Sequence, residues 1–415
     1  MKRYYNIAVF IFITLFISLI YSCKKKEVPT LTTTVLTNIT GTSATSGGTI
    51  ISEGSGTVVS KGVCWGNGID PTITDNKTTD GAGIGSFTSN LSGLNGSTKY
   101  YIRAYATNSA GTAYGNEINF ATNSTFTGPI FYNNNGKIIN AVCYGYFQNG
   151  QAPGSILTEN QIKEDLLIIK NHWDAIRLYS TDDNSENILK VISDNNVDLK
   201  VLLGIWISGK TPIDNASQVD RAIAQTNAYR NIVQGISCGN EIFLDPASEI
   251  YVTNTNEIIG YLNKIHDETT APVTIDDVYS IWLDPKYSDL VKLQDFLAIH
   301  IYGQWSNVPL ENTVSYINGS FNELKTQFPQ KPILITETGW TTSKNAGQFE
   351  PAADEVTQKQ FYSQCQQWSN LNEVPIFYFE AFNERWKGVT ATEAETNWGF
   401  YYADRMPKLV FQVVK

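Results

Sequence analysis

From residue 138 to residue 415, short apolar segments alternate with stretches of helical pattern, and this alternation constrains the fold more than any other feature. In the first helical stretch, apolar residues at helical spacing follow Thr158, a suitable N-cap residue. Eight such strand–helix pairs in a stretch of this length are typical of a TIM barrel. The predicted strands are residues 139–146, 175–179, 199–206, 232–240, 273–276, 296–302, 333–336 and 376–382.

These apolar segments are continuous and do not alternate with polar residues, which is typical of parallel strands buried on both faces. An open, doubly wound α/β sheet is the alternative arrangement. It is disfavoured because no glycine-rich fingerprint follows the first strand. The sequence therefore predicts an α/β fold, a TIM (β/α)8 barrel, over residues 138–415.

Residues 28–122 have a different texture, rich in Thr, Ser and Gly, with short alternating runs between turn signals and no helical period. This pattern predicts a small all-β sandwich. The segment around Tyr100 resembles the tyrosine corner of fibronectin type III and Ig-like domains, and residues 104–115 resemble repeats of secreted Bacteroidota proteins. The resemblance implies a spacer domain, with glycan binding as the alternative, and we expect Trp65 in its core. The polar residues 123–137 are predicted to be a linker.

The N-terminus has the pattern of a secretion signal over residues 1–22, with Lys2 and Arg3 before an apolar segment too short to span a membrane. The segment that ends in Ser22-Cys23 resembles a bacterial lipobox, which implies lipidation of Cys23 and a short tether over residues 23–27. Ordinary signal cleavage near Ser22 is the alternative. We therefore expect a protein secreted across the inner membrane and lipid-anchored to the outer membrane, on its periplasmic or its cell-surface face.

Composition excludes several other classes of protein. The formal net charge is −10, and the sequence holds three His and no extended basic cluster, which disfavours a nucleic-acid partner. His and Cys residues lack the spacing of a zinc site. We expect no metal, no cofactor and a monomer. Cys143 and Cys238 lie inside predicted barrel strands, where a free buried thiol is the commoner state.

Two predicted barrel strands end in a glutamate. Glu241 follows the fourth strand and Glu337 follows the seventh. Because the carboxyl ends of all barrel strands meet at one mouth, where the active sites of such barrels lie, we expect the two carboxyl groups to face each other there. Paired carboxylates are the machinery of glycoside hydrolysis.

The motifs around both glutamates resemble those of a known family. Gly239-Asn240-Glu241 and Thr336-Glu337-Thr338-Gly339-Trp340 are similar to the acid/base and nucleophile motifs of retaining (β/α)8 glycosidases, with the closest similarity to glycoside hydrolase family 17. Residues 176–179 and residues 382–400 resemble further motifs of that family. His300-Ile301-Tyr302 departs from the family's plant members and is closer to the cellulase-type relatives, which leaves the glucan linkage open.

The resemblance implies roles for these residues. Glu241 would be the acid/base, and it must hold a proton near neutral pH. Glu337 would be the nucleophile and must stay ionised, with the help of hydrogen bonds from Tyr302 and Arg177. Asn240 would bind the sugar 2-hydroxyl. The reaction would be double displacement on β-glucan, most simply as an endo-β-1,3-glucanase acting on a laminarin-type substrate.

Further substrate-binding candidates follow predicted strand ends. Five tryptophans lie there, and we expect two or three of them to contact sugar, whereas Trp173 and Trp368 lie in helical patterns and are expected to pack internally. The candidates are Tyr179, Trp206, Asp276, Asp277, Trp282, Trp305, Trp340, Glu384, Trp386 and Lys387. Two alternatives remain at this point. One is transglycosylation or another glucan linkage, and the other is a glycan-binding surface protein without catalysis.

Overall fold

The structure is a computed structural model that describes residues 26–123, 125–126, 130–132, 136–209, 214–248 and 250–412. The chain divides after Thr122 into two compact units, and each unit is described by itself. The predicted signal segment and Cys23 lie outside the described residues. Within the described part of the chain, no helix is long and apolar enough to cross a membrane.

The first unit is all-β, as predicted. One sheet has the order β1-β2-β5, and the other has the order β4-β3-β6-β7 with β8 also paired to β6. Both sheets contribute side chains to one apolar core, which includes Trp65, so the prediction for this tryptophan is confirmed. The strands are β1 (Thr30–Thr37), β2 (Ser43–Ser52), β3 (Ser60–Gly66), β4 (Asn76–Lys77), β5 (Gly85–Ser92), β6 (Lys99–Asn108), β7 (Gly111–Tyr114) and β8 (Ile118–Ala121).

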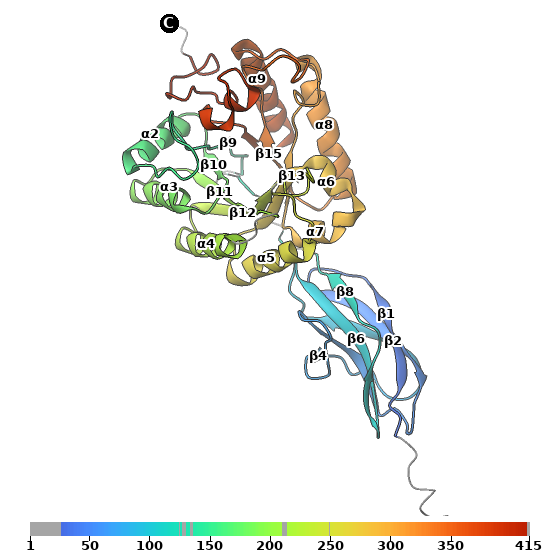
Figure 1. Ribbon diagram of the computed structural model, residues 1–415. Helices are drawn as coiled ribbons and strands as arrows, with labels where there is room; N and C mark the ends of the chain where they lie inside the picture. Colours follow the sequence, from blue (N-terminus) through green and yellow to red (C-terminus); the bar gives the residue numbers. More distant parts are fainter. Residues whose placement is uncertain are drawn as a thin grey trace, which may run out of the picture. The chain divides into compact units, whose positions relative to one another are not determined.

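The second unit is built around a closed barrel of eight strands, in which each strand pairs in parallel with its neighbours (Figure 1). The last strand, β16, pairs with the first, β9, so the sheet closes and the open doubly wound alternative is excluded. The strands are β9 (Ala141–Cys143), β10 (Ala175–Leu178), β11 (Lys200–Ile205), β12 (Val233–Asn240), β13 (Val273–Val278), β14 (Leu297–His300), β15 (Ile333–Thr338) and β16 (Ile376–Tyr378).

The first and last barrel strands are shorter than the apolar runs that predicted them. The runs continue to Tyr146 and Phe382, but only Ala141–Cys143 and Ile376–Tyr378 belong to strands. Most of the remaining residues are apolar and buried at the mouth of the barrel, where Tyr144 and Phe382 are in contact edge to face. Burial, not strand pairing, therefore produced the longer signal.

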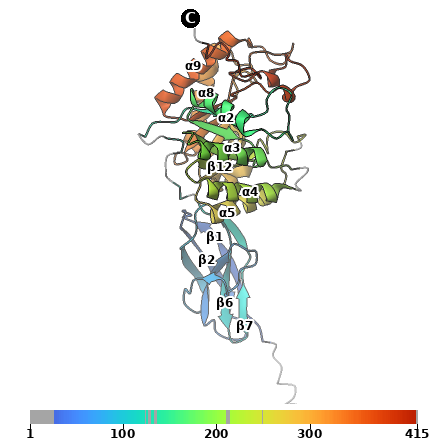
Figure 2. The ribbon, with the colours of Figure 1, turned by 90° about the vertical axis from the view of Figure 1, so that its left-hand side faces the viewer.

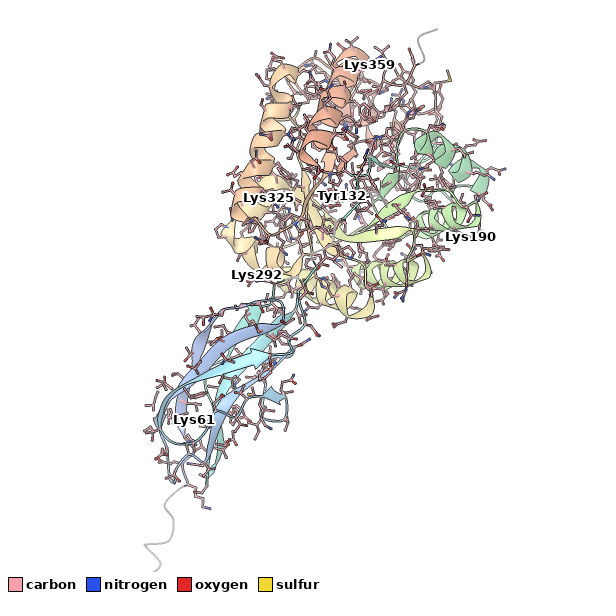
Figure 3. All side chains as sticks on the ribbon, turned by 180° about the vertical axis from the view of Figure 1, so that it is seen from behind. Lys61, Tyr132, Lys190, Lys292, Lys325 and Lys359 are labelled. Carbon is pink, nitrogen blue, oxygen red and sulfur yellow. The ribbon has the colours of Figure 1, made fainter. Side chains whose placement is uncertain are left out.

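Helices surround the barrel, and Figure 2 shows α2 to α5 following one another along one side. Thr158 caps α2 and forms a capping box with Gln161, as its position predicted. The outer faces of the helices carry exposed charges such as Lys190, Lys325 and Lys359 (Figure 3). The helices are α2 (Glu159–Lys170), α3 (Asp183–Asp194), α4 (Asn215–Ala228), α5 (Thr255–Glu268), α6 (Tyr279–Leu283), α7 (Ser288–Leu293), α8 (Leu310–Gln327) and α9 (Glu355–Asn372).

The segment after the barrel, residues 400–412, folds back onto it. Arg405 donates to both carboxylate oxygens of the buried Asp165 on α2, at 2.8 and 2.6 Å. The ring of Phe411 stacks on that of His172 with centroids 3.8 Å apart. Lys408 is buried and donates to the backbone oxygen of Asn397 at 2.9 Å. The C-terminal segment is therefore part of the barrel unit's packing.

Among the described residues, Cys64, Cys143, Cys238 and Cys365 are buried and free. For Cys143 and Cys238 this confirms the expected buried thiols.

Candidate active site

Glu241 and Glu337 meet at the carboxyl-terminal mouth of the barrel. Glu241 directly follows β12, and Glu337 is the penultimate residue of β15. A carboxylate oxygen of each, together with a ring nitrogen of His300, lie within 4.8 Å of one another. Carboxyl groups about 5 Å apart suit a retaining glycosidase, whereas an inverting enzyme needs a wider gap for water.

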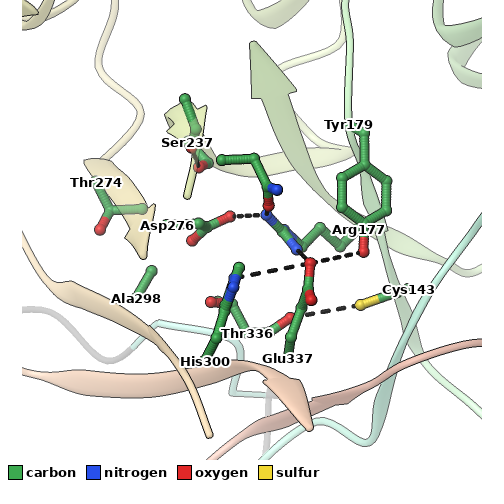
Figure 4. Close-up of polar contacts among 12 residues, drawn as sticks. Cys143, Arg177, Tyr179, Ser237, Thr274, Asp276, Ala298, His300, Thr336 and Glu337 are labelled. Carbon is green, nitrogen blue, oxygen red and sulfur yellow. Dashed lines mark hydrogen bonds and ion pairs between the residues drawn. The ribbon is translucent and has the colours of Figure 1, made fainter. Parts of the chain in front are cut away.

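Glu337 accepts hydrogen bonds on both of its carboxylate oxygens. Its Oε1 accepts hydrogen bonds from Arg177 and from the hydroxyl of Tyr179, the latter at 2.9 Å (Figure 4). Its Oε2 accepts one from the hydroxyl of Tyr302 at 2.7 Å. Burial alone would raise the pKa of Glu337, but the charges of His300 and Arg177 and the Tyr302 hydroxyl lower it to about 2. Glu337 is therefore an ionised carboxylate, as a nucleophile requires.

Glu241 has a more open environment. Its side chain keeps 28% of its surface exposed, and its Oε1 lies 2.8 Å from Nδ1 of His300. Its backbone has a φ of 52°, in the left-handed region, and its N–H donates to the backbone oxygen of Asp276 on the neighbouring strand at 2.8 Å. The preceding Gly239 has a φ of 106°, which a side chain would disfavour. The sequence Gly-Asn-Glu thus bends the chain where the strand ends.

Arg177 connects the two strand ends. Besides Glu337, its guanidinium contacts Asn240 Oδ1 at 2.6 Å and Asp276 Oδ2 at 2.5 Å, and all these groups are largely buried. Because Asn240 uses its amide oxygen as the acceptor for Arg177, its amide N–H groups are available to a ligand. Asp276 is therefore a site residue, as its place at the predicted end of the fifth strand indicated, and its partner is Arg177 on β10.

His300 is a functional residue to which sequence reasoning assigned no role. It is fully buried at the end of β14, and its Nε2 lies 3.7 Å from Glu337 Oε1 while its Nδ1 contacts Glu241. Burial lowers its pKa, but the two glutamates outweigh this and raise it. The same three side chains have the donor spacing of a metal site. The Arg177 guanidinium on Glu337 disfavours a second cation at that position.

A cleft of about 890 Å³ opens over the two glutamates. Among its lining residues are candidates that the sequence identified on six different strand ends. These are Tyr179, Trp206, Asn240, Glu241, Tyr302, Trp305, Glu337, Glu384, Trp386 and Lys387. Glu395 and Trp398 line it as well.

The five tryptophan candidates separate into two groups. Trp206, Trp305 and Trp386 line the cleft and are 44%, 38% and 40% exposed, so three rings are available for sugar stacking. Trp282 and Trp340 do not line it, which corrects the prediction for these two. Each is 1% exposed and donates its indole N–H to a backbone oxygen, that of Ala298 or of Ala352. They follow strand ends but turn into the packing behind the mouth.

Asp277 is also not a substrate contact. It is fully buried, and its carboxylate accepts the backbone N–H groups of Phe243 at 2.9 Å and Val278 at 2.8 Å. Burial raises its pKa to about 7. Successive residues on a strand point to opposite faces, so Asp276 faces the site and Asp277 holds the loop that follows Glu241.

The chain was compared with known proteins. The family described as the BtgE/BtgC glycoside hydrolase domain matches residues 141–399. A protein of Aspergillus niger that carries the name of a glucan endo-1,3-beta-glucosidase is 28% identical over 271 residues, which are 58% of this chain and 38% of that protein. The "Glucan 1,3-beta-glucosidase" of Arthroderma benhamiae is 24% identical over 61% of this chain and 85% of that protein. The chain spans about two fifths of the length of the Aspergillus relatives that it matches.

Solved structures share the fold. An endo-laminarinase from Formosa has a TM-score of 0.59 and 24% identity, over 65% of this chain and 85% of that one. A family 17 β-1,3-glucanosyltransferase from Rhizomucor miehei has a TM-score of 0.55 and 20% identity, over 66% of this chain and 96% of that one. At these identities the likeness concerns the barrel fold.

Proposed function

We propose that this chain, which belongs to the BtgE/BtgC glycoside hydrolase family, cleaves β-1,3-glucan with retention of configuration. The observation that carries the proposal is the pair Glu241 and Glu337, with carboxylate oxygens within 4.8 Å of each other in a cleft lined by exposed tryptophans. The names of the relatives, glucan 1,3-β-glucosidases and an endo-laminarinase, support the substrate class.

The reaction divides into two displacements. Glu337 attacks the anomeric carbon and forms a covalent glycosyl ester, while Glu241 gives its proton to the departing glycosidic oxygen. Glu241, now a carboxylate, then removes a proton from water. The resulting nucleophile attacks the same carbon, the ester bond breaks and Glu337 returns to its ionised state. Asn240 is placed to donate to the 2-hydroxyl, since Arg177 occupies its amide oxygen.

A sugar hydroxyl can replace water in the second displacement, which gives transglycosylation. The three exposed tryptophan rings favour this second candidate activity because a stacked glucan could serve as acceptor. A glycan-binding protein without catalysis is the weaker alternative, since binding does not require a buried nucleophile held by three donors.

The first unit is proposed to be an Ig-like or fibronectin type III-like spacer. In support, the hydroxyl of Tyr100 accepts the backbone N–H of Asn95 at 3.0 Å, the geometry expected of a tyrosine corner. Lipidation of Cys23 and attachment to the outer membrane are proposed from the residue pattern alone. Mass spectrometry of the membrane fraction, with Cys23→Ser as the comparison, tests this.

Product analysis tests the main proposal. The chain from residue 24 onward is incubated with laminarin, mixed-linkage glucan, β-1,6-glucan and cellulose, and products are separated by chromatography. Short oligosaccharides from laminarin alone, released as the β-anomer in NMR spectra, are expected. Products longer than an oligosaccharide substrate would establish transglycosylation. An α-anomer as first product, or no product with glycan binding retained, would contradict the retaining mechanism.

A further inference from the structure

Glu380 is a fully buried carboxylate that the mechanism above does not use. It lies two residues after β16, and its Oε2 accepts a hydrogen bond from the Lys387 ammonium at 2.8 Å. The same ammonium forms an ion pair with Glu384 Oε2. Glu380, Glu384, Trp386 and Lys387 are called the β16 cluster below.

The cluster joins a cation to an aromatic ring in the wall of the cleft. Trp386 donates its indole N–H to Glu384 Oε1 at 2.9 Å, and its ring is nearly perpendicular to that of Phe147, with centroids 5.8 Å apart. Lys387 Nζ lies 4.6 Å from the centre of the Phe379 ring. Glu384, Trp386 and Lys387 line the cleft, whereas Glu380 does not.

The Lys387 ammonium has one N–H more than its two carboxylate partners use. An ammonium carries three donors, and Glu380 and Glu384 take one each. Burial lowers the pKa of Lys387, but both carboxylates raise it further, so the group stays charged. Because Lys387 lines the cleft, its third donor is available to a hydroxyl oxygen of a bound sugar.

Stability alone does not account for the buried Glu380. The desolvation cost of a buried ion pair can equal or exceed its Coulombic gain, so such pairs contribute little net stability. Glu384 already neutralises Lys387, and Glu380 brings a second carboxylate to the same cation. Glu380 adds a second hydrogen-bond acceptor, which confines the Lys387 ammonium between two carboxyl groups and over the Phe379 ring.

We propose that Glu380 is a positioning residue: it fixes the Lys387 ammonium beside the half-exposed Trp386 ring, so that the two form one glucosyl-binding subsite. The ring takes the apolar C–H face of the sugar, and the ammonium donates to one of its hydroxyl oxygens. The inference rests on the proposed function.

The test measures binding in a Glu337→Gln background, so that the oligosaccharide is not consumed. Isothermal titration with laminarihexaose is expected to give about tenfold weaker binding for Glu380→Gln, the loss of roughly one charge-assisted hydrogen bond. Lys387→Met should lose a similar factor. The two changes together should cost no more than Lys387→Met alone, because Glu380 acts through the lysine. Glu380→Asp keeps the charge and should recover part of the affinity.

A matched control is Asp295→Asn, which changes another buried acid, whose carboxylate lies 3.0 Å from His266 Nε2. Asp295 precedes the first residue of β14 and so lies at the other end of the barrel. Asp295→Asn should lower the unfolding temperature without changing affinity for laminarihexaose. If Glu380→Gln behaves like this control, the positioning role is wrong. If Glu380→Gln does not fold, Glu380→Asp and Lys387→Met decide the question by the same titration. If the Glu337→Gln parent binds no laminarihexaose, the proposed substrate is wrong and this inference falls with it.

Discussion

The same residue type stands at two strand ends of one barrel, yet the two environments differ in almost every respect. At the end of β15, Glu337 keeps 7% of its side chain exposed and accepts hydrogen bonds from Arg177, Tyr179 and Tyr302. At the end of β12, Glu241 keeps 28% of its side chain exposed, and its carboxylate contacts His300.

This difference assigns the roles. Donors stabilise the ionised form of a carboxylate, so the crowded Glu337 is fixed as an anion that attacks carbon. An acid/base must exchange its proton with the leaving oxygen and with water, which requires access that Glu241 has and Glu337 lacks. The identity of the residue decides little here, and the surroundings of the two strand ends decide the chemistry.

The largest expected effect comes from removing the carboxylate at the end of β15. Glu337→Ala should lower kcat by about 10⁴-fold or more, because no covalent intermediate can form. Added azide should restore turnover of an activated aryl β-laminaribioside, and NMR should identify an α-glycosyl azide, the product of one inversion. A β-glycosyl azide would show that the two glutamates have been assigned in reverse.

The next largest effect tests the other strand end. Glu241→Ala should lose about 100-fold or more in kcat on laminarin, which needs a proton on its leaving oxygen. An aryl substrate with a good leaving group needs no proton, so formation of the glycosyl-enzyme should persist and appear as a burst of phenol. If Glu241→Ala slows formation of the glycosyl-enzyme equally on laminarin and on the aryl substrate, Glu241 is not the acid.

A smaller effect measures how strongly the donors hold Glu337 ionised. Tyr302→Phe removes one donor to the carboxylate, so the pKa of Glu337 should rise from its value of about 2. Since the nucleophile must be ionised, the acid limb of kcat/KM should move to higher pH, by about one unit for one charge-assisted hydrogen bond. An unmoved acid limb would mean that the partners other than Tyr302 hold the pKa of Glu337 low.

The smallest effect concerns the packing behind the end of β15. Trp340 follows Glu337 by three residues and is buried with its indole N–H on the backbone oxygen of Ala352. Trp340→Phe should lower the free energy of unfolding by about 1–3 kcal/mol in urea titrations and leave KM unchanged. Trp305→Phe, at a half-exposed ring in the cleft, should show the opposite pattern. A raised KM for Trp340→Phe would restore that residue to the substrate-binding set.

Much of this comparison could be predicted from the sequence. Continuous apolar strands at regular spacing specify a parallel barrel, and barrel closure brings any two strand ends to one mouth. The placement of Glu241 and Glu337 followed from those two facts. The predicted hydrogen bonds from Tyr302 and Arg177 to Glu337 are present in the structure.

The remaining details depend on which way a side chain turns at the end of its strand. Trp282, Trp305 and Trp340 all follow predicted strand ends. In the structure the side chains of Trp282 and Trp340 are buried in the packing, whereas that of Trp305 lines the cleft. The candidates Asp276 and Asp277 divide in the same way, because successive residues of a strand point to opposite faces. His300 was not assigned because its role exists only through two partners on other strands, which no local pattern records.

The segment that folds back after the barrel has a practical consequence for anyone who wishes to produce the catalytic unit alone. The family match ends at residue 399, but Arg405, Lys408 and Phe411 lie beyond it and are packed against α2, the Asn397 loop and His172. An expression boundary drawn at the end of the match would leave the acid Asp165 buried without its cation and uncover an aromatic surface. Truncation sites on this scaffold therefore belong after residue 412, and fusion partners attached there would leave the mouth of the barrel intact.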